Sequence, residues 1–313
     1  MQKGAGQKAG FPDEKYAAAG AVMVDTAEEI YGTCDFVAKV KEFEPSEYNL
    51  LREGQIVFTC IHPAAHPEEV QALLDKKVIA FTAEDSHRYG SPNCEAAGKQ
   101  AALSVLHALG AWVTVADINI GLLRTLQSQY NQSINTMISS RENIAAILPE
   151  TDMILNCVKW PKGNTEYLVT REMVRSMEPG SVLVDISNDE QGAIETFHET
   201  THENPRYVEE GVVHYCVSNI PGAIANSTSV AYAASVLPHF RSILNNGVPQ
   251  ACAKDGFLRR SLTTYKGYLT HEETSALQNR PWIRPEDILG IADQKLDPAP
   301  PATVTRSDNF ISL

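Results

Sequence analysis

Two lysines and a histidine near the start of the sequence are the side chains best suited to acid–base and anion chemistry. Lys39 and Lys41 alternate in DFVAKVKE, which predicts a strand with both ammonium groups on one face. His62 follows the apolar run IVFTCI, so a second strand would deliver its imidazole. At adjacent strand ends, a lysine would bind the carbonyl or carboxylate oxygen of an α-keto acid, and a histidine would exchange a proton near neutral pH. The alternatives are a solvated strand edge for the lysines and a histidine that is merely packed.

The elements that must position these residues are short apolar runs rich in β-branched residues, with helical patterns between several of them. Strands that alternate with helices favour a parallel sheet with crossover helices, so we predict an α/β fold. Helices are expected at 95–109, 120–130, 171–177 and 227–246. The expected strands are Phe36–Val40, Ile56–Thr59, Val78–Thr82, Trp112–Ala116, Met153–Val158, Val182–Ile186 and Val212–Val217.

One of these strands, in WVTVADIN, ends at Asp117 and is typical of a dinucleotide-binding fold. There the carboxylate would accept hydrogen bonds from the adenosine ribose, although a turn residue after a strand is an equal alternative. The usual companion is a G-x-G-x-x-G turn one βαβ unit upstream, and it is missing, because Gly90 and Gly98 have the wrong spacing. Asp189 lies in a glycine-containing loop after another strand. Such a loop lines the ligand crevice of open α/β sheets, or it is simple turn chemistry.

The stretch His198–His202, HETTH, fits the zinc motif H-E-x-x-H. Zinc binding would need a stable helix with both imidazoles on one face and a third ligand. Two adjacent threonines and a nearby proline give poor support to such a helix, so we interpret the match as coincidence and predict no metal site.

Composition narrows the class of protein. The chain has 313 residues, of which 43% are hydrophobic, so it can fill a core, and it has no apolar run long enough to cross a membrane. The net charge of −13 argues against nucleic acid as a partner. Six cysteines without a CxxC pair indicate buried thiols in a reducing compartment, and the N-terminus lacks an apolar signal-peptide core. We therefore expect a cytoplasmic protein.

Several stretches together resemble alanine dehydrogenase, of the family that also includes the transhydrogenase α subunit. The resemblance is colinear over nearly the whole chain apart from the tail. It implies a two-lobed fold in which a Rossmann-like domain is inserted between two halves of a substrate lobe. The corresponding boundaries are 1–92 and 221–295 for the substrate lobe, 93–110 for a connecting helix and 111–220 for the dinucleotide-binding domain. Residues 296–313 lie outside the resemblance, and their proline-rich, polar composition predicts a mobile tail. The stretches include DFVAKVKE, LREGQIVFTCIHPAAHPEEVQALLDKKVIAF, SPNCEAAGKQAA, LGAWVTVADINIGLLRTL, MEPGSVLVDISNDEQGAIET and PRYVEEGVVHYCVSNIPGAIANSTSVAYAASVLPHF.

The resemblance also implies roles for single residues. Lys41 corresponds to the lysine that contacts the keto acid, His62 to the acid/base histidine, and Asp189 to the aspartate beside the nicotinamide and the amino group. On the cofactor side, the resemblance implies contacts from Asp117 to the ribose, from Asn219 near the nicotinamide, and from Val158 and Ile186. Asn93 and Cys94 depart from the methionine and serine that touch substrate and cofactor in the family.

The implied activity is the reversible NAD-dependent oxidative deamination of L-alanine to pyruvate and ammonia, in a homo-oligomer, commonly a hexamer. Two departures accompany the resemblance: neither the family's opening strand, with its substrate-carboxylate arginine, nor its first Rossmann strand with the glycine turn is represented. An alternative is therefore an inactive member that acts as a binding or subunit-interaction protein. A third possibility is another imine-reducing member of the superfamily.

Overall fold

The computed structural model describes residues 1–88, 103–158, 160, 164–187, 192–302 and 311. The chain divides into two compact units. Unit 1 comprises residues 1–92 and 225–313, and unit 2 comprises residues 93–224.

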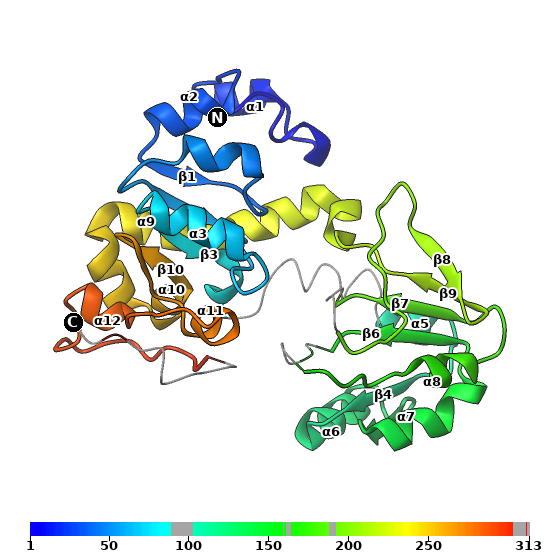
Figure 1. Ribbon diagram of the computed structural model, residues 1–313. Helices are drawn as coiled ribbons and strands as arrows, with labels where there is room; N and C mark the ends of the chain where they lie inside the picture. Colours follow the sequence, from blue (N-terminus) through cyan, green and yellow to red (C-terminus); the bar gives the residue numbers. More distant parts are fainter. Residues whose placement is uncertain (89–102, 159, 161–163, 188–191, 303–310, 312–313) are drawn as a thin grey trace. The chain divides into compact units, whose positions relative to one another are not determined.

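Unit 1 is built on a five-stranded sheet of order β1-β2-β3-β10-β11 (Figure 1). The first three strands are parallel, so their carboxyl ends meet at one edge of the sheet. β10 pairs antiparallel with β3 and with β11. The bounds are β1 Phe36–Ala38, β2 Ile56–Thr59, β3 Ile79–Thr82, β10 Leu262–Tyr265 and β11 Tyr268–Leu269.

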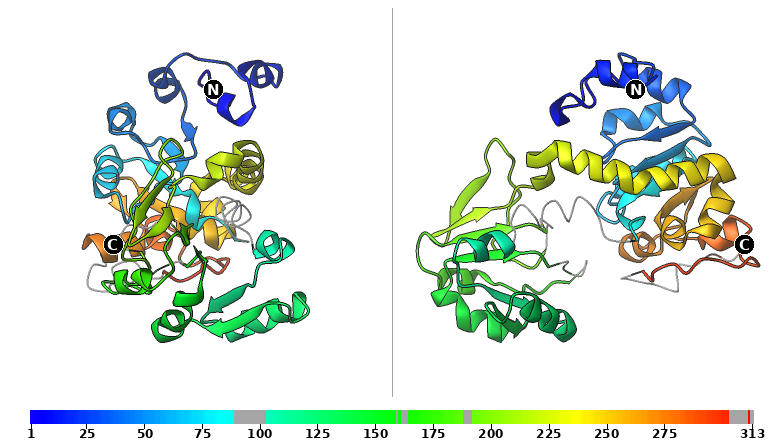
Figure 2. Two further views of the ribbon diagram at one scale, coloured as in Figure 1. Left: turned by 90° about the vertical axis from the view of Figure 1, so that its right-hand side faces the viewer. Right: turned by 180° about the vertical axis from the view of Figure 1, so that it is seen from behind.

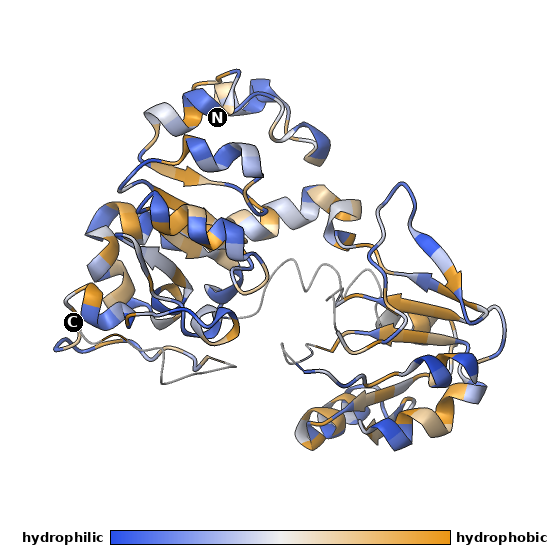
Figure 3. Ribbon diagram, in the orientation of Figure 1, coloured by the Kyte–Doolittle hydropathy of each residue, from blue (hydrophilic) through white to orange (hydrophobic). Residues whose placement is uncertain are grey.

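Successive side chains of β2 and β3 point to opposite faces of the sheet. Both sets are buried, each in its own apolar cluster, so both faces of the sheet are covered. Phe58 and Phe81 stack with ring centroids 5.9 Å apart and pack against the long helix α9 (Ala225–Lys254). Val57 and Ala80 belong to a second cluster that includes side chains of α2 and α3. Figure 2 shows α9 along one face of the sheet, and Figure 3 shows the apolar character of the strands.

The long helix α9 bends at Gly247, whose φ of 74° is non-helical. The other helices of unit 1 are short. α3 begins with Pro67 at its first position and carries Glu68 and Glu69 in its first turn, where carboxylates favour the helix dipole. The helical elements other than α9 are η1 Gln7–Ala9, α1 Asp13–Ala18, α2 Ala27–Thr33, η2 Pro45–Leu50, α3 Pro67–Asp75, η3 Ala83–Asp85, α10 Gly256–Ser261, α11 Glu272–Gln278 and α12 Pro285–Ile288.

Unit 2 contains two separate sheets. β4 and β5 form a parallel pair, whereas the other sheet has the order β6-β7-β9-β8, with β8 antiparallel to β9. Their bounds are β4 Thr114–Asp117, β5 Asn135–Ile138, β6 Met153–Asn156, β7 Val182–Asp185, β8 Arg206–Glu209 and β9 Val212–Tyr215. The helical elements are α5 Leu103–Ala108, α6 Ile120–Gln129, α7 Arg141–Ile147, η4 Leu148–Glu150, α8 Arg171–Arg175 and η5 Ile220–Ile224.

The strand orders of the two described sheets of unit 2 agree with the two sides of a doubly wound sheet. In such a sheet the spatial order of strands is 3-2-1-4-5-6. β5 and β4 match strands 3 and 2, and β6, β7 and β9 match strands 4, 5 and 6. Among the residues that the structure describes, nothing pairs with the edges of β4 and β6 where strand 1 would lie. The predicted parallel sheet is therefore present but interrupted.

The predicted mobile tail from Leu296 begins with residues that contact α10. The backbone N–H of Gly256 donates to Asp297 Oδ2 at 2.8 Å, and Arg259 Nη2 donates to the Asp297 carbonyl at 2.8 Å. Arg260 donates to the Pro300 carbonyl at 3.3 Å. These contacts attach the first part of the tail to unit 1, which the sequence did not anticipate.

Candidate active site

The carboxyl ends of β1 and β2 bring Lys41 and His62 to one place in unit 1. β1 ends at Ala38, so Lys41 lies in the following turn and not on the predicted strand. Thr59, the last residue of β2, donates from its hydroxyl to the Lys41 carbonyl at 2.5 Å and fixes this turn. The Lys41 side chain is 54% exposed, and its Nζ lies 3.8 Å from Glu42 Oε2.

His62 is held through both its backbone and its ring. Its φ is +46°, a left-handed conformation that costs a residue with a side chain about 1 kcal/mol or more. Its backbone N–H donates to Glu84 Oε1 at 2.5 Å, and its Nδ1 lies 2.5 Å from Glu42 Oε1. Its Nε2 lies 4.0 Å from Glu84 Oε1. We call Lys41, Glu42, His62 and Glu84 the acid–base cluster.

Charge and burial perturb the pKa values in this cluster. Burial alone would raise the pKa of Glu42, but the hydrogen bond with His62 and backbone N–H contacts outweigh it and lower the pKa to about 2. Burial alone would lower the pKa of His62, but the Glu42 hydrogen bond and the charges of Glu84 and Glu42 raise it above the usual value. The ion pair therefore favours an ionised carboxylate and a readily protonated imidazole.

Glu69, on α3, is the most deeply buried carboxyl group near this cluster, with 1% of its surface exposed. Burial raises its pKa to about 8, although the backbone N–H of Phe43 donates to its Oε1 at 3.1 Å and opposes the rise. The charge of Glu42 adds to the rise. Glu69 therefore holds a proton near neutral pH.

Lys39 has a different role from Lys41. Its Nζ lies 2.5 Å from Glu47 Oε2 and 5.0 Å from the centroid of the Phe43 ring. Glu47 also accepts a hydrogen bond from the Tyr31 hydroxyl at 3.0 Å. Lys39 thus connects β1 to η2, and the predicted pair of lysines on one strand face is wrong because β1 ends before either lysine.

In unit 2, Asp117 ends β4 as predicted. Its Oδ1 accepts the backbone N–H of Asn119 at 2.7 Å, and Asn119 in turn caps α6 by accepting from Leu122 N at 3.0 Å. These contacts are those of a turn residue. A contact of Asp117 with a ribose stays a prediction.

Val158 and Ile186 follow the neighbouring parallel strands β6 and β7. The Val158 carbonyl accepts the Ser187 hydroxyl at 2.7 Å, and Ile186 N donates to the Asn156 carbonyl at 2.9 Å. A buried bond of 3.0 Å from Asn156 Nδ2 to Asp185 Oδ1 also joins the two strand ends. The sequence reasoning missed this Asn–Asp pair, although both residues directly end apolar strands.

The remaining predicted residues of the cofactor side are only partly described. The carbonyl of Asn219 lies 2.7 Å from His202 Nε2. Asn93, Cys94 and Asp189 lie outside the described residues.

The two histidines of HETTH have separate partners. His198 Nε2 lies 3.1 Å from Glu209 Oε2, whereas His202 contacts the Asn219 carbonyl. In the part of the chain that the structure describes, no group of three side chains could hold a metal ion.

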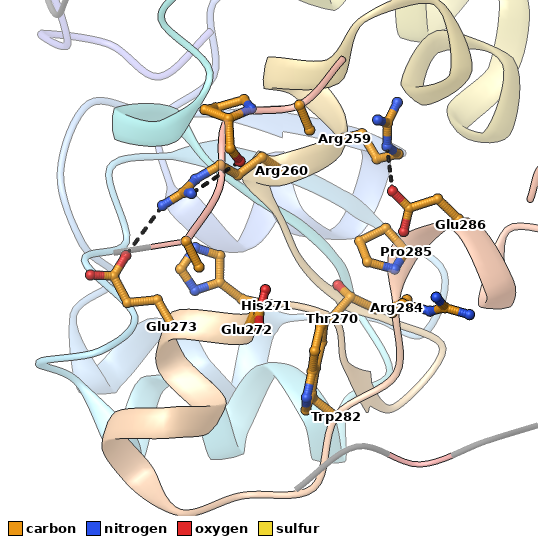
Figure 4. A pocket seen from close by; sticks show the side chains of 13 residues that line it. Arg259, Arg260, Thr270, His271, Glu272, Glu273, Trp282, Arg284, Pro285 and Glu286 are labelled. Carbon is orange, nitrogen blue, oxygen red and sulfur yellow. Dashed lines mark hydrogen bonds and ion pairs between the residues drawn. The ribbon is translucent and has the colours of Figure 1, made fainter. Parts of the chain in front are cut away.

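A hollow in unit 1 is lined by side chains around α10, α11 and α12 (Figure 4). Arg259 donates to Glu286 at 2.7 Å and to the Cys252 carbonyl at 2.9 Å, and Arg260 donates to Glu273 at 3.3 Å. Because carboxylates and carbonyls of the chain already use these guanidinium groups, the hollow is a poor anion site.

Taken together, the fold and the acid–base cluster define an α/β protein with one unit that carries acid–base groups and one unit with parts of a dinucleotide-binding sheet. Two family models match the chain: "Alanine dehydrogenase/PNT, N-terminal domain" over residues 1–103 and "Alanine dehydrogenase/PNT, C-terminal domain" over residues 96–272. The chain belongs to the alanine dehydrogenase/PNT family, whose members are oxidoreductases.

Individual relatives agree with this assignment. The chain is 34% identical to an alanine dehydrogenase of Methanococcus maripaludis over 337 residues, which covers 92% of this chain and 90% of the relative. It is 34% identical to an alanine dehydrogenase of Bacillus subtilis over 319 residues, which covers 87% and 84%. A solved L-alanine dehydrogenase superposes with a TM-score of 0.81 at 28% identity, covering 89% of this chain and 90% of that chain.

The first of these alignments is longer than the chain itself, at 337 against 313 residues. The relative therefore has positions that this chain lacks. Such a deletion agrees with the interrupted sheet of unit 2.

Among the described residues we find no helix with the length and hydrophobicity that crossing a lipid bilayer requires.

Proposed function

We propose that this chain is an alanine dehydrogenase-type protein in which unit 1 is the substrate lobe and unit 2 the dinucleotide lobe. Its reaction would be the reversible NAD-dependent deamination of L-alanine to pyruvate and ammonia. The observation that carries the proposal is the acid–base cluster, in which Lys41 and His62 lie beside one another at the carboxyl ends of parallel strands. This edge of a parallel sheet is where α/β proteins bind their ligands.

The groups of the cluster suit a keto acid and its amine. The Lys41 ammonium is half-exposed and is available to a carboxylate or carbonyl oxygen. His62 has a raised pKa, so it can hold a proton near neutral pH and return it to a substrate oxygen. Glu84 Oε2 is buried and has no hydrogen-bond partner in the described residues, which leaves an acceptor for an ammonium group. By resemblance, Asp189 would be a further acceptor.

The dinucleotide half fits its cofactor less well. A pyrophosphate binds at a glycine turn and helix N-terminus that follow strand 1 of a doubly wound sheet. The sequence has no G-x-G-x-x-G, and the described strands leave the place of strand 1 between β4 and β6 unpaired. The glycine turn is absent from the sequence, and the described strands do not complete an NAD site. We expect NAD(H) to bind weakly.

The interrupted sheet favours a second candidate, a family member that binds the keto acid without turning it over. In that case Lys41 and His62 would form a binding site, and the unit 2 strands would serve contacts between subunits. The two candidates share the substrate site and differ only in hydride transfer. By resemblance we also propose a homo-oligomer, which light scattering of the purified protein would test.

The test is the absorbance at 340 nm with pyruvate, ammonia and NADH. Dehydrogenase activity predicts a decrease that Lys41→Ala reduces by at least about tenfold, because the variant loses a charge-assisted contact with the substrate. Lys77→Ala is the matched control, since Lys77 is 53% exposed and pairs with Glu53. Equal rates in the two variants would exclude this site as the source of activity. No turnover, combined with pyruvate binding that only Lys41→Ala weakens, would favour the second candidate.

A further inference from the structure

Glu42 joins the two residues that carry the proposed chemistry. Its Oε1 lies 2.5 Å from His62 Nδ1, and its Oε2 lies 3.8 Å from Lys41 Nζ. The Glu42 side chain is 26% exposed, so a half-buried carboxylate lies between a lysine and an imidazole. No feature of the sequence drew attention to it, although it directly follows Lys41.

The chemistry of this contact determines which nitrogen of His62 carries the proton. An ionised carboxylate only accepts hydrogen bonds, so Nδ1 must be the donor at 2.5 Å. The neutral imidazole then has its lone pair on Nε2. A carboxylate that accepts from one nitrogen also makes the ring more basic, as it does in other acid–base and metal-binding histidines.

Nε2 has fewer contacts than Nδ1. The nearest carboxylate oxygen to it among the described residues is Glu84 Oε1, at 4.0 Å, beyond hydrogen-bond distance. Glu84 instead uses this oxygen for the backbone N–H of His62. The contact with Glu84 fixes the backbone of His62, and the contact with Glu42 fixes the orientation of its ring. Nε2 has neither contact and is the nitrogen that a ligand could reach.

We propose that Glu42 is the positioning residue of His62: its carboxylate fixes the Nδ1–H tautomer and leaves Nε2 as the nitrogen that exchanges a proton with the substrate. The inference deepens the proposed function and rests on it. The charged groups that act on the imidazole are Glu42 and Lys41 from the turn after β1, and Glu84 from η3. Two further groups, His66 before α3 and Glu69 in its first turn, act on Glu42. His66 Nε2 lies 3.9 Å from Glu42 Oε1 and is the only other imidazole at Glu42 among the described residues.

The test is nuclear magnetic resonance of the nitrogen-15-labelled histidine rings, because it reads tautomer and proton affinity without turnover. His62→Gln identifies the His62 signals among those of nine histidines. In the unmodified protein we expect neutral His62 to be the Nδ1–H tautomer and to titrate above the ordinary histidine value. Glu42→Gln should lower its proton affinity by at least tenfold, and the more conservative Glu42→Asp by less. Glu53→Gln, at an exposed pair with Lys77, should leave His62 unchanged.

A merely structural role for Glu42 would lower stability without changing the titration of His62. An Nε2–H tautomer in the unmodified protein, or equal proton affinity in Glu42→Gln and Glu53→Gln, would overturn the proposal. If Glu42→Gln does not fold, Glu42→Asp is the second variant: its shorter carboxylate should still lower the proton affinity of His62 relative to Glu53→Gln, and equal affinity in these two variants would overturn the proposal. Failure of the dehydrogenase assay alone would contradict the proposed function and leave this result standing. If turnover is found, the alkaline limb of kcat/KM for pyruvate should move to lower pH in Glu42→Gln, because His62 must be protonated in this direction of the reaction.

Discussion

The sheets of the two units differ in continuity. In unit 1, five strands form one sheet, and both faces of β2 and β3 are buried. In unit 2, the described strands form two sheets with an interruption between β4 and β6. The acid–base cluster lies on the continuous sheet, and the predicted ribose contact lies on the smaller piece of the interrupted one. The proposed substrate site in unit 1 therefore lies on a continuous sheet, whereas the predicted ribose contact in unit 2 lies on a sheet that is interrupted among the described strands.

The largest effects should come from removing a buried side chain from each unit in turn. Phe58 and Leu183 are both fully buried, the first in unit 1 and the second in unit 2. Phe58→Ala should lower the free energy of unfolding of unit 1 by about 4 kcal/mol, and Leu183→Ala that of unit 2 by about 3 kcal/mol. Hydrogen exchange measured segment by segment should show each loss in the unit that carries the change. Equal losses in both units for either variant would mean that the two units unfold as one.

The free energy of unfolding of unit 1 should depend on pH because of Glu69. The folded pKa of about 8 is above the ordinary value of 4.5, so the folded state keeps a proton that the unfolded state loses. Stability should therefore fall as the pH rises from 4.5 to about 8. Glu69→Gln removes this penalty and should raise the free energy of unfolding at pH 7 by about 3 kcal/mol, with no gain at pH 4.

Glu42 should act in the opposite direction. Its folded pKa of about 2 is below 4.5, so its contribution is present above pH 4.5 and is lost as the pH falls toward 2. Denaturant unfolding from pH 3 to 9 measures both contributions. An unchanged pH profile in Glu69→Gln would contradict the burial argument for that carboxyl group.

The interruption in unit 2 should appear as fast backbone exchange. β2 has a paired strand on each side, whereas β4 pairs only with β5 among the described residues. Amides of β2 should be protected about 100-fold more than those of β4, a difference of about 2.7 kcal/mol in opening free energy. Mass spectrometry of peptides that cover the two strands measures this ratio. Equal protection would indicate that another segment covers the open edge of β4.

The smallest effect should come from the tail contact of unit 1. Asp297→Ala removes the acceptor of the Gly256 N–H and a partner of Arg88. Because this contact is exposed and solvent screens it, we expect a loss in the free energy of unfolding that is smaller than in any of the variants above. Asp293→Ala, at an exposed residue close by, is the control. A loss of several kcal/mol would show that the tail is an integral part of the unit 1 core.

Much of the fold could be predicted from apolar runs. The observed β2 has the predicted bounds, and β7 differs by one residue at its end. β5, β8 and β10 were missed because their sequences, NTMI, RYVE and LTTY, mix polar and apolar residues. In β10 the threonines are fully buried, and Thr264 donates its hydroxyl to the Val78 carbonyl at 2.8 Å. A pattern of apolar residues cannot detect a strand whose buried side chains are threonines with hydrogen-bonded hydroxyls.

The site could be predicted only in part. Lys41 was found from its alternation with Lys39 and His62 from its place after an apolar strand, and the structure brings the two together through Glu42. Glu42 and Glu84 were missed because their roles depend on a left-handed turn at His62 and on the register of neighbouring strands, which no local pattern encodes. A carboxylate next to a candidate lysine, and another just after β3, were the signals available.

Calorimetric titration of the purified chain with NADH and, separately, with pyruvate most directly tests the contrast between the proposed substrate site in unit 1 and the proposed nucleotide site in unit 2. We predict saturable pyruvate binding that Lys41→Ala weakens at least about tenfold, and an NADH dissociation constant of about 1 mM or weaker. Micromolar affinity for NADH, or pyruvate binding that is indifferent to Lys41, would contradict the account.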